Sequence, residues 1–107
     1  MVKYVNSESL EELIKSSKLP VFCDFWASWC GPCRMLAPVF EAVSDKYENE
    51  AVFVKIDIDE EDSEASAVKY GISSIPNIIA FKNGVAVDSN LGFVPEDTLC
   101  AFVEKNL

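Results

Sequence analysis

VFCDFWASWCGPC, residues 21–33, is the stretch around which the rest of the chain is organised. Residues 20–27 are nearly all apolar, which is typical of a strand buried on both faces of a sheet. Downstream, apolar residues recur at helical spacing from Met35 to Tyr47. Cys30 and Cys33 therefore lie on a strand-to-helix turn, where free backbone N–H groups and the positive end of the helix dipole favour a thiolate.

Two cysteines at this spacing can form a disulfide or contribute half of a zinc or iron–sulfur site. A metal site needs further thiolates or imidazoles, but the chain has no histidine, and Cys23 and Cys100 stand alone. We therefore interpret the pair as redox chemistry. Cys30, nearer the helix start and solvent, is the expected nucleophile, and Cys33 is the expected resolving thiol. For Cys23 and Cys100 we favour small buried hydrophobes over regulatory thiols.

Composition limits the remaining classes of function. The chain has 107 residues, half of them hydrophobic and a quarter charged, which fits one domain over residues 1–107. Its net charge of −9 argues against nucleic acid and membrane surfaces as partners. The lack of histidine excludes Cys–His and Ser–His–Asp systems. No export signal or membrane-length apolar run is visible, so we expect a cytoplasmic protein. Separately, we expect a monomer.

The order of elements predicts an α/β fold. Strands are expected at residues 2–5, 20–27, 51–58, 77–81 and 85–88, and helices from Asn6 or Ser7, from Pro32 with a kink at Pro38, over 63–70 with a cap at Gly71, and from Pro95 to Leu107. Asn83-Gly84 is a strong hairpin signal. We predict a mixed five-stranded sheet of three parallel strands and an antiparallel hairpin, flanked by four helices.

Asp24 is the second unusual feature, because an acid inside an apolar strand is costly unless it is paired. A solvated acid at a sheet edge is the alternative, but the neighbours on each side are bulky and apolar. We interpret Asp24 as a buried carboxyl with a raised pKa that relays a proton for the cysteine pair. The acidic run from Asp57 to Glu64 lacks the ligand spacing of a calcium loop and is more typical of a solvated surface.

Several blocks together resemble the thioredoxin family. They are DFWASWCGPC at 24–33, KIDID at 55–59, YGI at 70–72, Ile75-Pro76, FKNG at 81–84, and Gly92. These blocks span nearly the whole chain, so the resemblance is highly specific. It implies the thioredoxin fold and a general protein-disulfide reductant that transports electrons through Cys30 and Cys33.

The resemblance also implies roles for individual residues. Asp24 would act on the resolving cysteine, and Lys55 would lie near that acid, although a plain surface lysine is an equal alternative from the residues alone. Pro76 would follow a cis peptide bond opposite the thiols, and the Ile75 backbone would pair with the bound substrate strand. The substrate-binding set would then be Trp29, Gly31, Pro32, Ile75, Pro76 and Gly92.

Four positions depart from the family pattern. Ser74 stands where glycine is common, Asn77 where threonine is usual, and Phe93 where a smaller residue often occurs. Arg34 replaces a frequent lysine and keeps the charge. None of these changes removes a reacting group, but the first three affect the rim that target proteins approach.

The expected partners are a thioredoxin reductase, either NADPH–flavin or ferredoxin-linked, and disulfide-containing target proteins. No bound cofactor is expected beyond a redox-active Cys30–Cys33 disulfide. Two other functions were weighed. An oxidant or isomerase on the same fold is disfavoured because Gly31-Pro32, and no histidine, separates the cysteines. A redox-inactive interaction scaffold is disfavoured because Asp24 and Pro76 accompany an intact cysteine pair.

Overall fold

A mixed five-stranded sheet forms the centre of the computed structural model, which describes residues 1–107. The strands are β1 (Val2–Tyr4), β2 (Val21–Trp26), β3 (Val52–Asp57), β4 (Asn77–Lys82) and β5 (Val85–Leu91), in the spatial order β1-β3-β2-β4-β5. β3 pairs in parallel with β1 and β2, whereas β4 runs antiparallel to β2 and β5. The predicted sheet and its mixture of pairings are confirmed.

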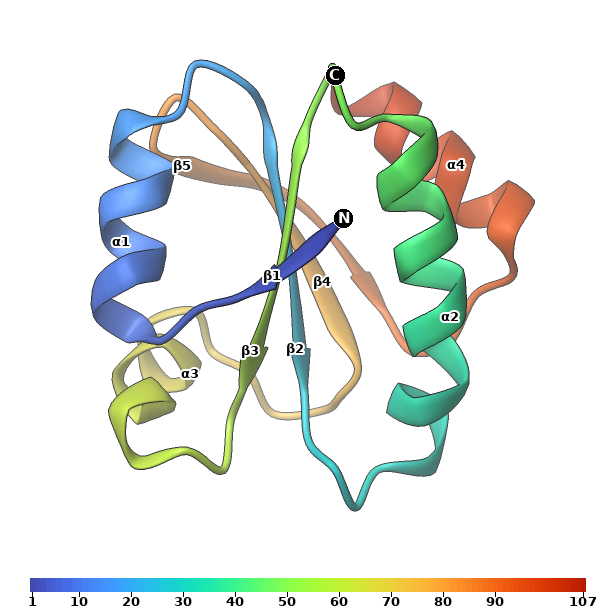
Figure 1. The fold of residues 1–107 in the computed structure, drawn as a ribbon. Coiled ribbons are helices and arrows are strands. Elements are labelled where there is room, and N and C mark those ends of the chain that lie inside the picture. The colour runs from blue at the N-terminus through green and yellow to red at the C-terminus, as the bar shows by residue number, and fades with distance from the viewer.

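The helices cover both faces of the sheet. They are α1 (Ser7–Ser16), α2 (Gly31–Lys46), α3 (Glu64–Lys69) and α4 (Glu96–Lys105), with a short 3-10 turn, η1 (Glu61–Ser63), before α3. Figure 1 shows α2 and α4 on one side of the sheet and α1 and α3 on the other. We call these the α2 face and the α1 face. None of the helices has the length and apolar character that crossing a bilayer requires.

Local sequence signals set most of the helix ends. Asn6 caps α1, because its side-chain oxygen accepts the Ser9 N–H at 2.9 Å while the Ser9 hydroxyl accepts the Asn6 N–H at the same distance. α2 continues through Pro38 as one element. α3 stops before Gly71, whose φ of 64° is a left-handed conformation that glycine adopts without strain. The last helix ends at Lys105, so Leu107 lies beyond it and not on its buried face as expected.

The β4–β5 hairpin is longer than its apolar pattern predicts. Asn83 and Gly84 both have positive φ, 55° and 79°, as a tight two-residue turn requires. β5 then continues past Asp88 to Leu91, since Asn90 and Leu91 still pair with the start of β4. A register shift, or β-bulge, opposite Ala80 interrupts the ladder. Backbone pairing, which the side-chain pattern does not reveal, thus carries the strand three residues further than expected.

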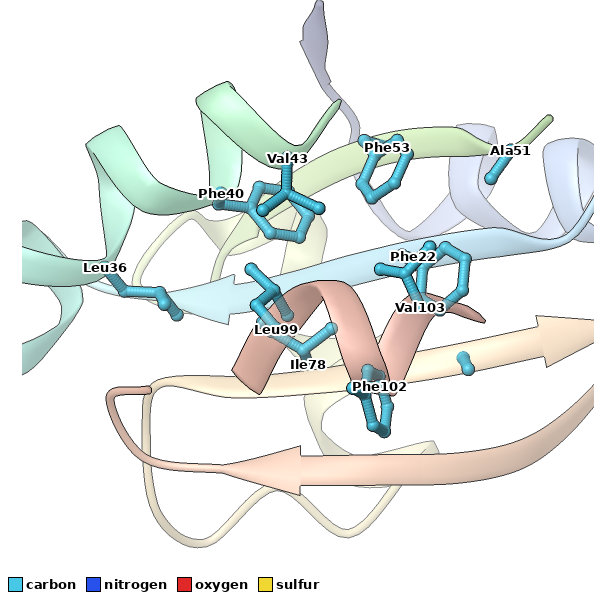
Figure 2. Packing of buried hydrophobic residues seen from close by; sticks show 11 residues of the cluster. Phe22, Leu36, Phe40, Val43, Ala51, Phe53, Ile78, Leu99, Phe102 and Val103 are labelled. Carbon is cyan, nitrogen blue, oxygen red and sulfur yellow. The ribbon is translucent and has the colours of Figure 1, made fainter. Parts of the chain in front are cut away.

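Each face of the sheet carries its own hydrophobic cluster. Figure 2 shows the cluster on the α2 face, where Phe22 of β2 lies among side chains that come from α2, α4 and β3. Phe22 stacks on Phe53 with ring centres 5.3 Å apart, and Phe40 meets Phe53 edge to face at 5.6 Å. The cluster on the α1 face includes Leu10 of α1 together with Cys23. Both clusters meet at β2, the central strand, which ends at the cysteine pair.

Candidate redox site

The Cys30–Cys33 disulfide lies where β2 passes into α2. Cys30 is the N-cap of α2 and has an extended backbone, while Cys33 is in the first turn, so their Cα atoms are 5.2 Å apart. The Cys33 N–H points at Cys30 Sγ across 3.2 Å. Pro32 occupies a first-turn position where no N–H is needed. The helix start therefore directs a donor and its positive dipole end at the Cys30 sulfur.

A loop from a distant part of the chain faces this sulfur. The Ile75–Pro76 peptide bond is cis, and the Ile75 carbonyl oxygen lies 3.8 Å from Cys30 Sγ. Gly92, just after β5, donates its N–H to the Pro76 carbonyl at 2.8 Å and has a φ of 89°. The loop before β4 and the end of β5 are thus held together, and the cis bond that the resemblance implies is present.

Exposed apolar side chains surround the disulfide. Trp29 is 66% exposed, and its indole N–H donates to Asp59 Oδ2 at 2.6 Å. Met35 and Leu91, with exposed fractions of 60% and 63%, also lie in the segments that meet here. From the sequence, Asp59 belongs to the KIDID block and to a solvated acidic run, and Met35 to the apolar pattern of a helix, and neither pattern points to this site. Asp59 instead fixes the orientation of Trp29, a role that no local pattern signals.

Asp24 is fully buried on the central strand, which excludes the alternative of a solvated edge acid. Neither carboxyl oxygen has a hydrogen-bond partner. Burial raises the pKa of Asp24 to about 7, and the positive charge of Lys55 partly opposes that rise. A carboxyl with this pKa exchanges a proton readily at neutral pH.

Lys55 lies next to Asp24 in the sheet, because the two residues are in register on the parallel strands β2 and β3. Only 8% of Lys55 is exposed, so it is not a plain surface lysine. Its ammonium forms no salt bridge. The ring centres of Trp26 and Tyr4 lie 4.5 Å and 5.6 Å from Lys55 Nζ. The pairing of Lys55 with Asp24 is thus electrostatic and not a direct ion contact.

Comparison with known proteins agrees with this geometry. A family model described as Thioredoxin matches residues 1–105. The chain belongs to the thioredoxin family.

Several named thioredoxins are similar to it over nearly all of its length. A protein named Thioredoxin M-type, chloroplastic, from Pisum sativum is 47% identical over 104 residues, 97% of this chain and 59% of the pea protein. Thioredoxins from Synechocystis sp. and Porphyra purpurea are 48% and 43% identical, over 96% and 97% of this chain and 94% and 95% of theirs. The chain therefore spans about three fifths of the pea relative and nearly all of the other two.

Thioredoxins are protein-disulfide oxidoreductases, and a CxxC pair closed as a disulfide at a helix start fits a thiol–disulfide reductant. The remaining cysteines are separate from the pair. Cys23 is fully buried on the α1 face, where burial raises the pKa of its thiol well above the usual value and the Asp24 charge adds to that rise. Cys100 is half-buried on α4. No group of three potential ligands is arranged to hold a metal ion.

The positions that depart from the thioredoxin pattern do not all lie at the rim of the site. Ser74 is exposed just before the cis peptide bond, and Phe93, 40% exposed, follows Gly92. Asn77 begins β4, and its side-chain oxygen is buried without a partner. Arg34 donates to the Ser28 carbonyl at 2.9 Å and so braces the turn before the disulfide. Ser74 and Phe93 are therefore exposed beside Pro76 and Gly92, whereas Asn77 lies on the α1 face of β4 together with Ile79.

Proposed function

We propose that the chain is a general protein-disulfide reductant that cycles between a Cys30–Cys33 dithiol and disulfide. One observation carries this proposal: the disulfide closes at the N-terminus of α2 with the Ile75 carbonyl oxygen only 3.8 Å from Cys30 Sγ. A bound target strand beside Ile75 therefore has its own disulfide within reach of the more exposed of the two sulfurs.

The reaction proceeds in two exchanges. The Cys30 thiolate attacks one sulfur of a target disulfide, which breaks that bond, forms a mixed disulfide and releases the first target thiolate to take a proton. The Cys33 thiolate then attacks Cys30 Sγ, so the Cys30–Cys33 disulfide forms and the second target thiolate leaves. Two electrons pass to the target, and the chain is left oxidised.

Asp24 supplies the base for the second exchange. Cys33 is almost fully buried, so its thiol needs a nearby acceptor before it can attack. Asp24 lies on the α2 face of β2, opposite Ile78 of the cluster there, and its pKa of about 7 leaves it close to half ionised at neutral pH. It takes the Cys33 proton directly or through water and later returns it to the departing thiolate, while Lys55 stabilises the ionised carboxylate.

Target proteins dock on the apolar surface around the sulfurs. Trp29, Gly31 and Pro32 form one side of this docking surface, and Ile75, Pro76 and Gly92 form the other. Backbone pairing at Ile75 gives affinity with little demand on target sequence. Asp59, part of the acidic run from Asp57 to Glu64, contacts Trp29 on this surface, so partners with complementary basic surfaces associate faster at low salt.

A partner reductase returns the electrons. Both an NADPH–flavin reductase and a ferredoxin-linked reductase fit the proposal, because either needs only access to the disulfide. The pea relative is named as chloroplastic. For this chain we propose a monomer that works in a reducing compartment such as the cytoplasm, where thiols are kept reduced between cycles. Activity with each purified reductase tests which of them is the partner, and fractionation of the source cells tests the compartment.

Trapping the intermediate tests the central mechanism. The chain is first reduced with dithiothreitol, which is then removed because it would itself resolve a mixed disulfide. When it is mixed with insulin as the disulfide substrate, the unchanged chain is expected to turn over once and to end as the Cys30–Cys33 disulfide. Cys33→Ser is expected to stop turnover and accumulate a mixed disulfide at Cys30, because the resolving sulfur is gone. Cys100→Ser, on α4, is the matched control and should turn over normally. Turnover by Cys33→Ser would contradict the two-step exchange.

The reduction potential of the pair separates a reductant from an oxidant on the same fold. We expect a potential clearly more negative than that of the glutathione pool, where about 30 mV is a tenfold change in equilibrium. A potential well above that pool would identify an oxidant or isomerase. A pair that never closes in solution would identify a redox-inactive scaffold.

A further inference from the structure

Three strands place Tyr4, Lys55 and Asp24 in one row across the sheet. Tyr4 of β1 is in register with Lys55 of β3, and Lys55 is in register with Asp24 of β2. Side chains at paired positions of parallel strands point to the same face. All three therefore lie on the α2 face, together with Trp26, which is two residues beyond Asp24.

The Lys55 ammonium needs an explanation, since burying an unpaired ammonium is costly. It makes neither a salt bridge nor a hydrogen bond, although 92% of the residue is buried, its exposed fraction being 8%. What it has are two aromatic rings, with centres 4.5 Å away for Trp26 and 5.6 Å for Tyr4. Both distances are within the range of a cation–π interaction. The two rings meet edge to face at 6.2 Å.

Lys55 is in turn the one opposite charge that acts on Asp24, whose oxygens have no hydrogen-bond partner. Other titratable groups also lie on this face. α2 brings Glu41 near the start of β1, and Tyr47 of α2 and Cys100 of α4 pack against the cluster there. β3 brings Asp57 two residues beyond Lys55, and Cys33 in the first turn of α2 does not titrate while it is in the disulfide. β4 contributes Ile78, which does not titrate. A change in the position of Lys55 therefore reaches the Asp24 carboxyl with little compensation.

We propose that Tyr4 is a positioning residue for the exchange reaction: its ring and that of Trp26 form an aromatic clamp that holds the Lys55 ammonium beside the Asp24 carboxyl. Tyr4 touches neither the substrate nor the sulfurs. It acts by keeping a flexible lysine side chain inside the fold, where its charge stabilises the ionised carboxylate that accepts the Cys33 proton. The inference rests on the proposed function for its consequence in catalysis, but the clamp itself can be measured without any substrate.

The direct measurement is the titration of the Asp24 carboxyl by carbon-13 NMR in the oxidised protein. Tyr4 is 69% exposed, so Tyr4→Leu is expected to fold. It should let Lys55 move towards solvent and raise the Asp24 midpoint by roughly 0.3–0.7 pH units, the upper end being the full loss of a partly exposed cation–π contact. Tyr4→Phe keeps the ring and should leave the midpoint unchanged.

Two further variants show whether the effect passes through Lys55. Lys55→Met should raise the Asp24 midpoint more than Tyr4→Leu does, and adding Tyr4→Leu to it should have no further effect. Lys69→Met is the charge-matched control, because Lys69 lies over a different ring, that of Tyr70, at 5.4 Å. It should not move the midpoint. A folded Tyr4→Leu protein with an unchanged midpoint, or a shift that persists without Lys55, overturns the clamp.

The reaction itself supplies the last readout. The pH profile of insulin reduction by Tyr4→Leu should move upward by the same amount as its Asp24 midpoint. A moved midpoint with an unmoved rate profile would show that Tyr4 positions Lys55 but has no part in the exchange, which overturns the proposal as stated. If the unchanged chain reduces no disulfide at all, the proposed function fails, while the NMR titration still decides whether the clamp exists.

Discussion

The two faces of β2 differ in what they bury. On the α1 face the strand presents Val21, Cys23 and Phe25, all of them apolar and fully packed. On the α2 face it presents Phe22, then Asp24 with no hydrogen-bond partner. Residues one position apart along the same strand therefore have opposite effects on stability, because successive side chains point to opposite faces.

The difference shows that the destabilising residue of β2, Asp24, lies on only one of its two faces. Burial of Asp24 stabilises nothing, since an ionised carboxyl without hydrogen bonds loses its hydration. The Asp24 side chain lies on the face of the sheet that α2 and the cysteine pair cover, whereas the core of the α1 face holds no unpaired charge. The α1 face is thus expected to supply stability, and the α2 face beneath the start of α2 to supply reactivity.

The largest expected effect is a loss of stability on removing a buried side chain from the α1 face. Phe25→Ala removes a fully buried ring that packs edge to face against Tyr70 at 6.2 Å, and should lower the free energy of unfolding by about 3–5 kcal/mol. Urea unfolding measures the loss. The folded fraction should still reduce insulin at the normal rate. A rate that falls further than the folded fraction does would mean that the α1 face also serves the reaction.

Asp24→Asn tests the α2 face through pH. The pKa of Asp24 is about 7 in the fold, against 3.8 in the unfolded chain. Each unit of this difference lowers the free energy of unfolding by about 1.4 kcal/mol once the carboxyl is ionised, which makes a loss of about 4 kcal/mol in all. Because ionisation is disfavoured in the fold, this loss is absent below pH 3.8 and complete above about pH 7. The free energy of unfolding of Asp24→Asn, relative to that of the unchanged oxidised protein, should therefore rise by up to about 4 kcal/mol between pH 4 and pH 8.

The same variant should lose activity while it gains stability. Without a base beside Cys33, the second exchange slows and the mixed disulfide lasts longer. Stopped-flow reduction of a labelled target measures this rate. An unchanged rate together with the stability gain would remove Asp24 from the reaction, and a stability curve parallel to that of the unchanged protein would show that Asp24 does not titrate near neutral pH.

Cys23→Ser sharpens the comparison at nearly constant volume. The hydroxyl would be buried among apolar side chains with no partner, so the free energy of unfolding should fall by about 1–3 kcal/mol. Cys100→Ser is the matched control, since its half-buried hydroxyl can reach water, and should change stability by less than about 0.5 kcal/mol. A loss at Cys23→Ser as small as the change at Cys100→Ser would show that the α1 face tolerates a buried hydroxyl.

The smallest effect concerns an acid on the α1 side. Although partial burial opposes it, the hydrogen bonds from Lys69 and Tyr70 lower the pKa of Glu11 below its usual 4.5. Its stabilisation is therefore present above pH 4.5 and lost as pH falls, opposite in sign to Asp24. Glu11→Gln should cost about 0.5 kcal/mol at pH 7 and less at pH 4, as measured by urea unfolding. A larger cost at pH 4 than at pH 7 would contradict this sign.

Sequence reasoning predicts the elements more fully than their arrangement. Hydrophobic periodicity, the Asn83-Gly84 turn and the cap at Gly71 are local signals, and the structure has the elements that they predict. The cis Ile75–Pro76 bond was implied by family resemblance alone. The contact between Trp29 and Asp59 has no local signature, because it joins a turn to a loop thirty positions away.

The surroundings of Lys55 show the same limit. Tyr4 reaches it only because the spatial order places β1 beside β3. The sequence predicts both strands and their parallel direction, but the order that places Tyr4 beside a residue fifty-one positions away follows from packing over the whole sheet. The prediction for Leu107 is wrong for a local reason: its spacing fits the last helix, but that helix ends two residues earlier. Helical periodicity does not fix where a terminus frays.

The exposed borders of the sheet have a consequence for the behaviour of concentrated protein. β1 is only three residues long and carries Lys3, and the opposite border, β5, lies across a bulge from β4 and carries Asp88 and Asn90. Short, charged or irregular borders give a second chain little to pair with, which is how sheets resist growth into fibrils. At the β5 border, where Val85, Val87 and Leu91 are exposed, the bulge and the charge of Asp88 are therefore the features that oppose addition of a second chain.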